Sequence, residues 1–179
     1  MLSLKESILS STRTGKSAFK IIVNSWLELS NAIKKIIRKN SIHCSLNDID
    51  TSKIESMSDL FEYKKFDGDI SKWDVRNVTD MACMFKYSSY TGKNGDISKW
   101  DVRKVTDMYA MFVKSKYNRN ISEWDVSNVM DMRHMFKNSQ FNQDISNWKI
   151  NPNCKTENMF ENCPIIEEYK PKQNGKTIE

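Results

Sequence analysis

The chain has 179 residues, a hydrophobic content of 39% and a formal net charge of +5. This length suits one domain, or one domain with a short appendage. Five Gly and three Pro are too few for a collagen-like or low-complexity disordered chain. Residues 1–45 carry eight Lys or Arg against two Glu, whereas residues 46–148 carry fifteen against sixteen acidic residues. The basic character therefore belongs to the N-terminal segment.

That segment begins with a polar, Ser/Thr-rich stretch, residues 1–17, which suits a short helix or a flexible arm. Residues 18–39 are predicted to form a helix, because apolar residues recur every three or four positions. They are Phe19, Ile22, Val23, Trp26, Leu27, Leu29, Ile33, Ile36 and Ile37. A basic arm of this kind can contact nucleic acid or an anionic membrane surface. The alternative is an ordinary solvated helix face.

No apolar run is long enough for a membrane span. The best N-terminal candidate, AFKIIVNSWLEL, is interrupted by Lys20, Asn24 and Glu28, so we expect neither a signal peptide nor a span. The four cysteines, Cys44, Cys83, Cys154 and Cys163, have no metal-binding spacing and are expected to be free thiols.

One short unit dominates the rest of the chain. Four copies begin at Trp73, Trp100, Trp124 and Trp148 and end in Phe, and a weaker copy spans Ile49 to Phe61. The steps between successive tryptophans are 27, 24 and 24 residues. A fixed period in this range is typical of a solenoid, in which each unit buries its apolar face against its neighbours.

Each unit contains two periods. In ISKWDV, Trp100 and Val102 alternate with polar residues, which predicts a strand. Val105, Met108, Met111 and Phe112 follow with helical or 3₁₀ spacing. We therefore predict an α/β fold, a short leucine-rich-repeat-like solenoid of about five units with a stack of parallel strands and an N-terminal helical cap. The predicted boundaries are 1–45 for the arm and cap, 46–163 for the solenoid and 164–179 for a C-terminal tail.

The repeat resembles the BspA-like leucine-rich-repeat proteins. The string DVSNV-x-DM-x-x-MF followed by FN-x-DIS-x-W (Asp125 to Phe136, then Phe141 to Trp148) carries the likeness, which covers residues 29–170. Members are often bacterial surface proteins, and phages and large viruses encode short relatives. The resemblance implies a binding or adhesion role and no catalytic residues.

Three patterns suggest chemistry, and each has a simpler interpretation. TRTGKS (Thr12 to Ser17) resembles the end of a phosphate-binding loop, but Ser10 stands where the first Gly belongs. Rows of Asp, such as Asp74, Asp101 and Asp125, suit Ca²⁺ or a structural role as acceptors of backbone N–H groups. His43 and His134 have no carboxylate partners in the pattern. We therefore expect no enzyme, metal or cofactor.

Positions that differ between units are the best candidates for partner binding, because identical positions serve the stack. The inserted loop Lys86 to Gly95 is a second candidate, since it carries two tyrosines. The predicted partner-binding residues are Arg76, Arg103, Tyr87, Tyr90, Lys72 and Lys99. The expected function is that of a non-enzymatic binding or structural protein. More specifically, we expect a phage or viral structural or host-interaction protein, located in the cytoplasm or the virion. The alternative is a cytoplasmic regulator or a nucleic-acid-associated protein that uses the basic arm.

Overall fold

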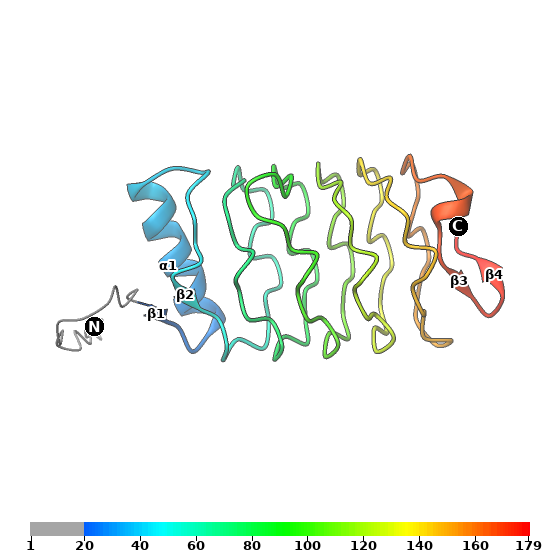
Figure 1. Cartoon of the computed structure of the whole chain (residues 1–179), viewed down its shortest axis with the longest axis horizontal. Helices are drawn as coiled ribbons and strands as arrows, with labels where there is room; N and C mark the ends of the chain where they lie inside the picture. Colours follow the sequence, from blue (N-terminus) through cyan, green and yellow to red (C-terminus); the bar gives the residue numbers. More distant parts are fainter. Residues whose placement is uncertain (1–19) are drawn as a thin grey trace.

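The computed structural model of the chain describes residues 20–179. The helix α1 (Trp26–Lys39) lies at one end of an elongated molecule, and the hairpin of β3 (Lys172–Gln173) and β4 (Lys176–Thr177) lies at the other (Figure 1). Turn-rich repeat units are lined up between these ends along the long axis. The loop Thr12 to Ser17 and the beginning of the predicted N-terminal helix lie outside the described residues.

Helix α1 begins at Trp26, later than the predicted residue 18. The hydroxyl of Ser25 accepts a hydrogen bond from the Glu28 N–H, and the Glu28 carboxylate accepts one from the Asn24 N–H. This Ser-x-x-Glu arrangement resembles a capping box, with the difference that the carboxylate accepts the N–H of Asn24, one residue before the N-cap. The preceding β1 (Ile21–Ile22) pairs in parallel with β2 (Ile49–Asp50). The predicted boundary is therefore wrong, because the cap and the strand pairing outweigh the apolar periodicity.

Helix α1 covers the first repeat unit. Leu29 and Ile33 are fully buried in the main core, whereas Leu27 on the opposite side is exposed. The Trp26 indole N–H donates to the Ser58 carbonyl at 2.8 Å. The helix therefore shields both apolar side chains and a main-chain acceptor at this end of the molecule.

The prediction of an α/β leucine-rich-repeat-like solenoid with a stack of parallel strands is wrong. The described residues contain one α-helix, one 3₁₀ turn (η1, Glu167–Tyr169) and four two-residue strands in two small sheets, β1–β2 and β3–β4. The described part of the chain has no helix or strand between residues 51 and 166. There the repeat units consist of turns, and the β pairing between them is limited to isolated parallel bridges such as Asp80 to Asp107 and Asp107 to Asp131.

Rows of main-chain hydrogen bonds connect neighbouring units. In each of the first four units, the N–H groups of four alternate residues donate to carbonyls of the following unit at 2.8–3.1 Å. We call such a set a donor row. The second unit, for example, donates from Met81, Cys83, Phe85 and Tyr87 to Asp107, Tyr109, Met111 and Val113. Because these N–H groups bond between units, they cannot also bond within a helix.

Backbone conformation explains why the apolar spacing of three produced no helix. In the third unit Ala110 has a φ of 53° and Lys114 a φ of 52°, and the equivalent residues of the other units also have positive φ. A left-handed residue interrupts a right-handed helix after a single turn. The N–H groups between the donors, such as that of Met111, instead close four-residue turns, here onto the Met108 carbonyl.

The tryptophan positions show why the alternating segments form no ladder of strands. All four repeat tryptophans are buried, as predicted, and stack in pairs, with ring centroids 6.4 Å apart for Trp73 and Trp100 and 6.5 Å for Trp124 and Trp148. Each indole N–H donates to a main-chain carbonyl of the preceding unit at 3.0–3.3 Å. Side chains therefore replace the main-chain bonds of a sheet at this corner of the unit.

Aromatic rings also fill the centre of the units. Successive phenylalanines stack nearly parallel with centroids 5.5–5.7 Å apart; they are Phe61, Phe85, Phe112, Phe136 and Phe160. Methionines at the neighbouring repeat positions, such as Met84 and Met111, are fully buried beside them. The repeat positions therefore form continuous columns of core side chains, and identical residues recur because each contacts its counterpart.

The C-terminal segment covers the apolar end of the last unit. Ile178, which follows β4, is 5% exposed and belongs to the main core, as do Ile165 and Phe160. The Gln173 amide donates to the carbonyls of Asn151 and Cys154 and accepts from the Thr156 hydroxyl. Besides these side chains, one main-chain bond holds the segment, from the Ile145 N–H to the Tyr169 carbonyl at 3.0 Å, and no row of main-chain bonds to it forms within the described residues.

Candidate functional site

Arg76 and Arg103 lie on an outer strip of the repeat units, where residues alternate with the buried Trp and Val. Each guanidinium makes two hydrogen bonds to the aspartate two residues earlier, Asp74 or Asp101. The hydrogen bonds from the arginine lower the pKa of that aspartate below its ordinary value. Both arginine side chains remain about two-thirds exposed. They are available to a partner, but their charge is already balanced locally.

Lys72 and Lys99 occupy the same outer strip, on the other side of the tryptophan. Lys99 pairs with Glu123 of the next unit at 2.8 Å, and both side chains are largely exposed. Lys72 is held by its main chain, since its N–H donates to the Asn47 side chain. The four basic residues predicted from the unit-to-unit variation therefore lie on one strip, which we call the charged strip and define by Lys72, Arg76, Lys99 and Arg103.

Replacing both Arg76 and Arg103 with serine, the residue at position 127, should leave the melting temperature almost unchanged. The ion pairs are exposed, so solvent screening leaves them little net contribution to stability. In the fourth unit the Ser127 hydroxyl and N–H already bond to Asp125, which shows that serine satisfies the turn. Thermal unfolding followed by circular dichroism measures the effect. If the double variant is unfolded at ambient temperature, the two arginines are required for the stability of the fold.

Tyr90 cannot contact a partner, because the structure buries it completely. Its ring stacks between Phe66 and Tyr117, at 6.3 and 5.9 Å, and its hydroxyl donates to the Gly95 carbonyl at 2.5 Å. The prediction of Tyr90 as a binding residue is therefore wrong. The equivalent positions hold Phe66, Tyr117 and Phe141, and this recurrence of aromatic residues every 24 or 27 positions was the signal for a core column.

Tyr87 lies on the surface as predicted, and the structure adds a neighbour that the sequence analysis missed. Tyr63 stacks on Tyr87 with centroids 4.7 Å apart and is 65% exposed. The Lys114 ammonium lies 5.1 Å from the centre of the Tyr87 ring. We call these three residues the tyrosine ridge. They occupy equivalent positions in consecutive units, and all three have positive φ. The step of 24 from Tyr63 to Tyr87 was the available signal.

The inserted loop borders a polar hollow. Its wall includes Lys93, Asn94, Asp96, Arg119, Asn120 and Glu123. Two glycines permit the loop path: Gly92 has a φ of 70°, and a Cβ on Gly95 would lie 2.5 Å from an Asp69 carboxylate oxygen. Thr91 and Asn94 bond to the side chain and carbonyl of Asp67, which fixes the loop to the first unit. The loop is thus bonded to Asp67 through both Thr91 and Asn94.

The aspartate rows serve the turns. Asp69, Asp74, Asp80 and Asp101 each accept the N–H of the residue two positions later, and the same holds in later units. This confirms the structural interpretation of the rows. Asp59, Glu62 and Cys83 have ligand atoms within 4.8 Å of one another. However, Lys86 pairs with Glu62 at 2.9 Å, and burial raises the pKa of the Cys83 thiol, which favours its neutral form. Glu62 is therefore engaged in an ion pair with Lys86, and the group of three residues needs no metal ion to explain it.

The two histidines are not arranged for catalysis with each other. His134 lies edge-on to Tyr109, with ring centroids 5.8 Å apart, and its Nδ1 is buried without a hydrogen-bond partner in the described residues. His43 is exposed, at the other end of the repeats, beside the Asp67 carbonyl. All four cysteines are free thiols.

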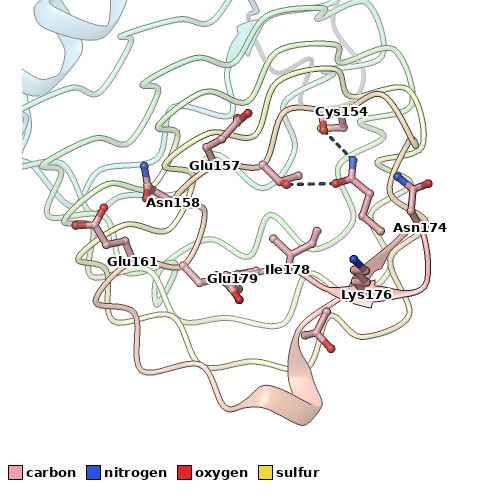
Figure 2. Close-up of a pocket in the computed structure, with 12 residues that line it drawn as sticks. Cys154, Glu157, Asn158, Glu161, Asn174, Lys176, Ile178 and Glu179 are labelled. Atoms are coloured by element: carbon pink, nitrogen blue, oxygen red, sulfur yellow. Dashed lines mark hydrogen bonds between the residues drawn. The ribbon is translucent and has the colours of Figure 1, made fainter.

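A pocket lies where the last unit meets the C-terminal segment (Figure 2). Glu157, Asn158 and Glu161 line one side, and Lys176 and Ile178 line the other. Cys154 lies at its edge, and burial raises the pKa of its thiol from 9.0 to about 11. The raised pKa makes this thiol a poor nucleophile near neutral pH.

The free energy of unfolding should fall as pH rises from about 9 to about 11. The raised pKa of Cys154 means that the folded state prefers the neutral thiol, so this preference is intact below pH 9.0 and is lost through about 11. Burial also raises the pKa of Tyr90 and Tyr117, which acts in the same direction. Urea unfolding across this range measures the slope. In Cys154→Ala the slope should be smaller, and an identical slope would contradict the assignment to this thiol.

A family model described as "Mycoplasma protein of unknown function, DUF285" matches the chain twice, over residues 28–115 and 87–174. The chain belongs to this family. The two matches overlap and together cover the whole repeat region, with most of α1 included. No curated protein and no solved structure matched the chain. The family is compatible with the resemblance to BspA-like repeat proteins.

The search for membrane spans gave no candidate. Within residues 20–179, no helix combines the length and the apolar composition that crossing a bilayer requires.

Proposed function

We propose that this member of the DUF285 family is a non-enzymatic binding or structural protein whose repeats hold a protein partner. The finer part of the proposal is that it is a BspA-like protein of the short phage or viral type, with a structural or host-interaction role in the cytoplasm or the virion. The sequence resemblance supports this finer part. The charged strip and the tyrosine ridge support the broader part, because both present exposed side chains of types that are common in protein interfaces.

The observation that carries the proposal is the tyrosine ridge. Tyr63 is 65% exposed and Tyr87 39%, although most aromatic residues at repeat positions are buried. Leaving stacked aromatic rings in water forgoes the stabilisation that burial provides. Tyrosine is also among the residues that dominate protein interfaces, as a large and rigid side chain with a polar end. Lys114 lies over the Tyr87 ring and forms no salt bridge with another described residue, so the partner surface is expected to include a carboxylate.

A photo-crosslinking amino acid at position 63, introduced in the source cell, tests this proposal. We expect a covalent adduct with one protein, and Tyr87→Ser should reduce its yield by about tenfold or more, which corresponds to about 1.4 kcal/mol. Loss of the adduct in the Arg76→Ser/Arg103→Ser double variant, with Tyr87→Ser neutral, would move the interface to the charged strip. The same crosslinking amino acid at position 103 probes the charged strip. If neither position gives a protein adduct, a binding role for both surfaces is contradicted.

The second candidate function is nucleic-acid association through the basic N-terminal segment. The exposed cations of α1, Lys34, Lys35, Arg38 and Lys39, form no salt bridge with another described residue. Burial, together with the nearby positive charge of Lys34, lowers the pKa of Lys64. Fluorescence anisotropy with a labelled oligonucleotide distinguishes the two functions, since phosphate-driven binding weakens steeply with added salt.

A further inference from the structure

The fifth repeat unit is the last to take part in the rows of main-chain hydrogen bonds, and its own donor row has no acceptor in the described residues. Its carbonyls at Lys155, Glu157, Met159 and Glu161 accept the donor row of the fourth unit. Its own donor row consists of the N–H groups of Thr156, Asn158, Phe160 and Asn162. No group in residues 20–179 accepts a main-chain hydrogen bond from these four. The far end of the molecule therefore presents an open row of four donors.

The C-terminal segment covers the apolar side chains at this end but not the donors. Ile178 packs into the core, and Gln173 bonds to carbonyls near Asn151 and Cys154. Between this segment and the fifth unit lies the pocket of Figure 2, whose wall includes Thr156, Asn158 and Phe160. Three of the four donor residues thus border open space.

The four earlier rows indicate which chemistry satisfies the fifth. Each is met by four carbonyls from a polypeptide that runs parallel to it. The fifth row has the same backbone shape, because Asn158 and Asn162 have φ values of 56° and 55°, like their counterparts in the earlier units. Continuity with these interfaces therefore favours a polypeptide main chain in the same turn conformation, in the manner of strand addition at an open sheet edge.

The charges around the row indicate the side chains of that polypeptide. Glu157, Glu161 and Glu179 line the pocket with Lys176 as the single cation among its lining residues. In the preceding interface, Lys137 of the fourth unit pairs with Glu161 at 2.6 Å. Arg133 of the same unit is at the position equivalent to Glu157, and the charge of Glu157 acts on it. A segment with basic residues at these two positions complements the pocket.

The first repeat unit of a second copy does not supply that segment. The carbonyl-bearing end of the first unit is covered by α1, which buries Leu29 and Ile33 and bonds to the Ser58 carbonyl. Two copies joined through their fifth units would bring donors against donors. Neither end of the described repeats of a second copy therefore fits, which favours a segment of a partner protein.

We propose that the open donor row of the fifth unit binds a basic segment of a partner protein through its main-chain carbonyls, and so extends the stack by one unit. This surface is separate from the tyrosine ridge, so the inference stands whether or not the ridge binds a partner.

Amide hydrogen exchange measured by NMR tests the first half of the inference. The amides of Thr156, Asn158, Phe160 and Asn162 should exchange at least about a hundredfold faster than their bonded counterparts, Met132, His134, Phe136 and Asn138, because bonded core amides exchange only upon opening. Equal protection of the two rows would mean that the fifth row is already occupied, and would overturn the inference.

A fusion tests the second half. Residues 127–141 provide a suitable probe, because this segment presents carbonyls at Asp131, Arg133, Met135 and Lys137 to the third unit's row. A copy appended after Glu179 through a Gly/Ser linker has a local concentration in the millimolar range. Protection of the four amides should rise at least about tenfold relative to a fusion with the same residues in scrambled order.

Charge reversal in the appended copy distinguishes specific docking from nonspecific association. Arg133→Glu and Lys137→Glu within the appended copy should remove most of the added protection, since they place acid against Glu157 and Glu161. The original residues 133 and 137 of the fourth unit stay unchanged in this fusion, so the fold is not affected. Equal protection in the repeat and scrambled fusions would overturn the inference, and protection that survives the charge reversal would overturn its requirement for a basic segment.

Discussion

Replacing Trp124 with alanine should lower the free energy of unfolding by about 3–5 kcal/mol. The side chain is 3% exposed and stacks on both Trp148 and Phe112, with centroids 6.5 Å away in each case. Its loss leaves a cavity between two units and removes the donor from the Ile97 carbonyl, to which the indole N–H bonds at 3.1 Å. Chemical denaturation measures the change.

Two controls separate the contributions at this position. Trp124→Phe keeps an aromatic ring in the column but loses the bond to Ile97, so it should be less destabilising than alanine by more than about 1 kcal/mol. Met130→Ala removes an exposed methionine of the same unit and should change the free energy of unfolding by less than about 0.5 kcal/mol. A Trp124→Ala protein as stable as the parent would refute the stacking of the units through their tryptophans.

Replacing Leu29 with alanine should cost about 2–5 kcal/mol, because α1 protects the apolar end of the first unit. Leu29 is fully buried in the main core. Without the methyl groups of Leu29 the helix loses its firmest contact, and a terminal unit without a cap exposes its apolar face. Thermal and urea unfolding measure the loss of stability, and light scattering measures any association that follows.

Leu27 provides the matched control on the same helix. Its side chain is 62% exposed, so Leu27→Ala changes the same residue type with little loss of buried surface. We expect a change below about 0.5 kcal/mol for Leu27→Ala. Similar effects of the two substitutions would show that the helix is not packed as described, and would contradict its role as a cap.

Much of the core could be predicted from the sequence. The recurrence of Trp, Met and Phe at fixed steps correctly placed these side chains in the core, where the phenylalanines stack in one column and the tryptophans in two pairs. The secondary structure could not be predicted in this way. Spacings of two and three indicate which side chains lie inside, but a turn can produce the same spacing as a strand or a helix. The positive φ of Ala110 has no sequence signal, because alanine ordinarily favours a helix.

The binding residues were predicted unevenly for a related reason. Variation between units identified exposed positions such as Arg76 and Arg103, but it could not show that each arginine is paired with its own aspartate. Residue type suggested both tyrosines of the inserted loop. Their burial depends on position in the unit, which places Tyr90 in a core column and Tyr87 beside Tyr63 on the surface.

The sequence by itself determined the period of the chain, the side chains that form the columns and the basic character of the N-terminal segment. These follow from composition and recurrence, which are properties of the linear chain. Only the tertiary structure decided which main-chain hydrogen bonds form, because each N–H group of a donor row can bond to a carbonyl in its own unit or to one in the next unit. Packing of the side-chain columns sets the distance between units and thereby favours the bonds to the next unit. It therefore also decided that the fifth unit, which no further unit follows within residues 20–179, keeps four donors open there.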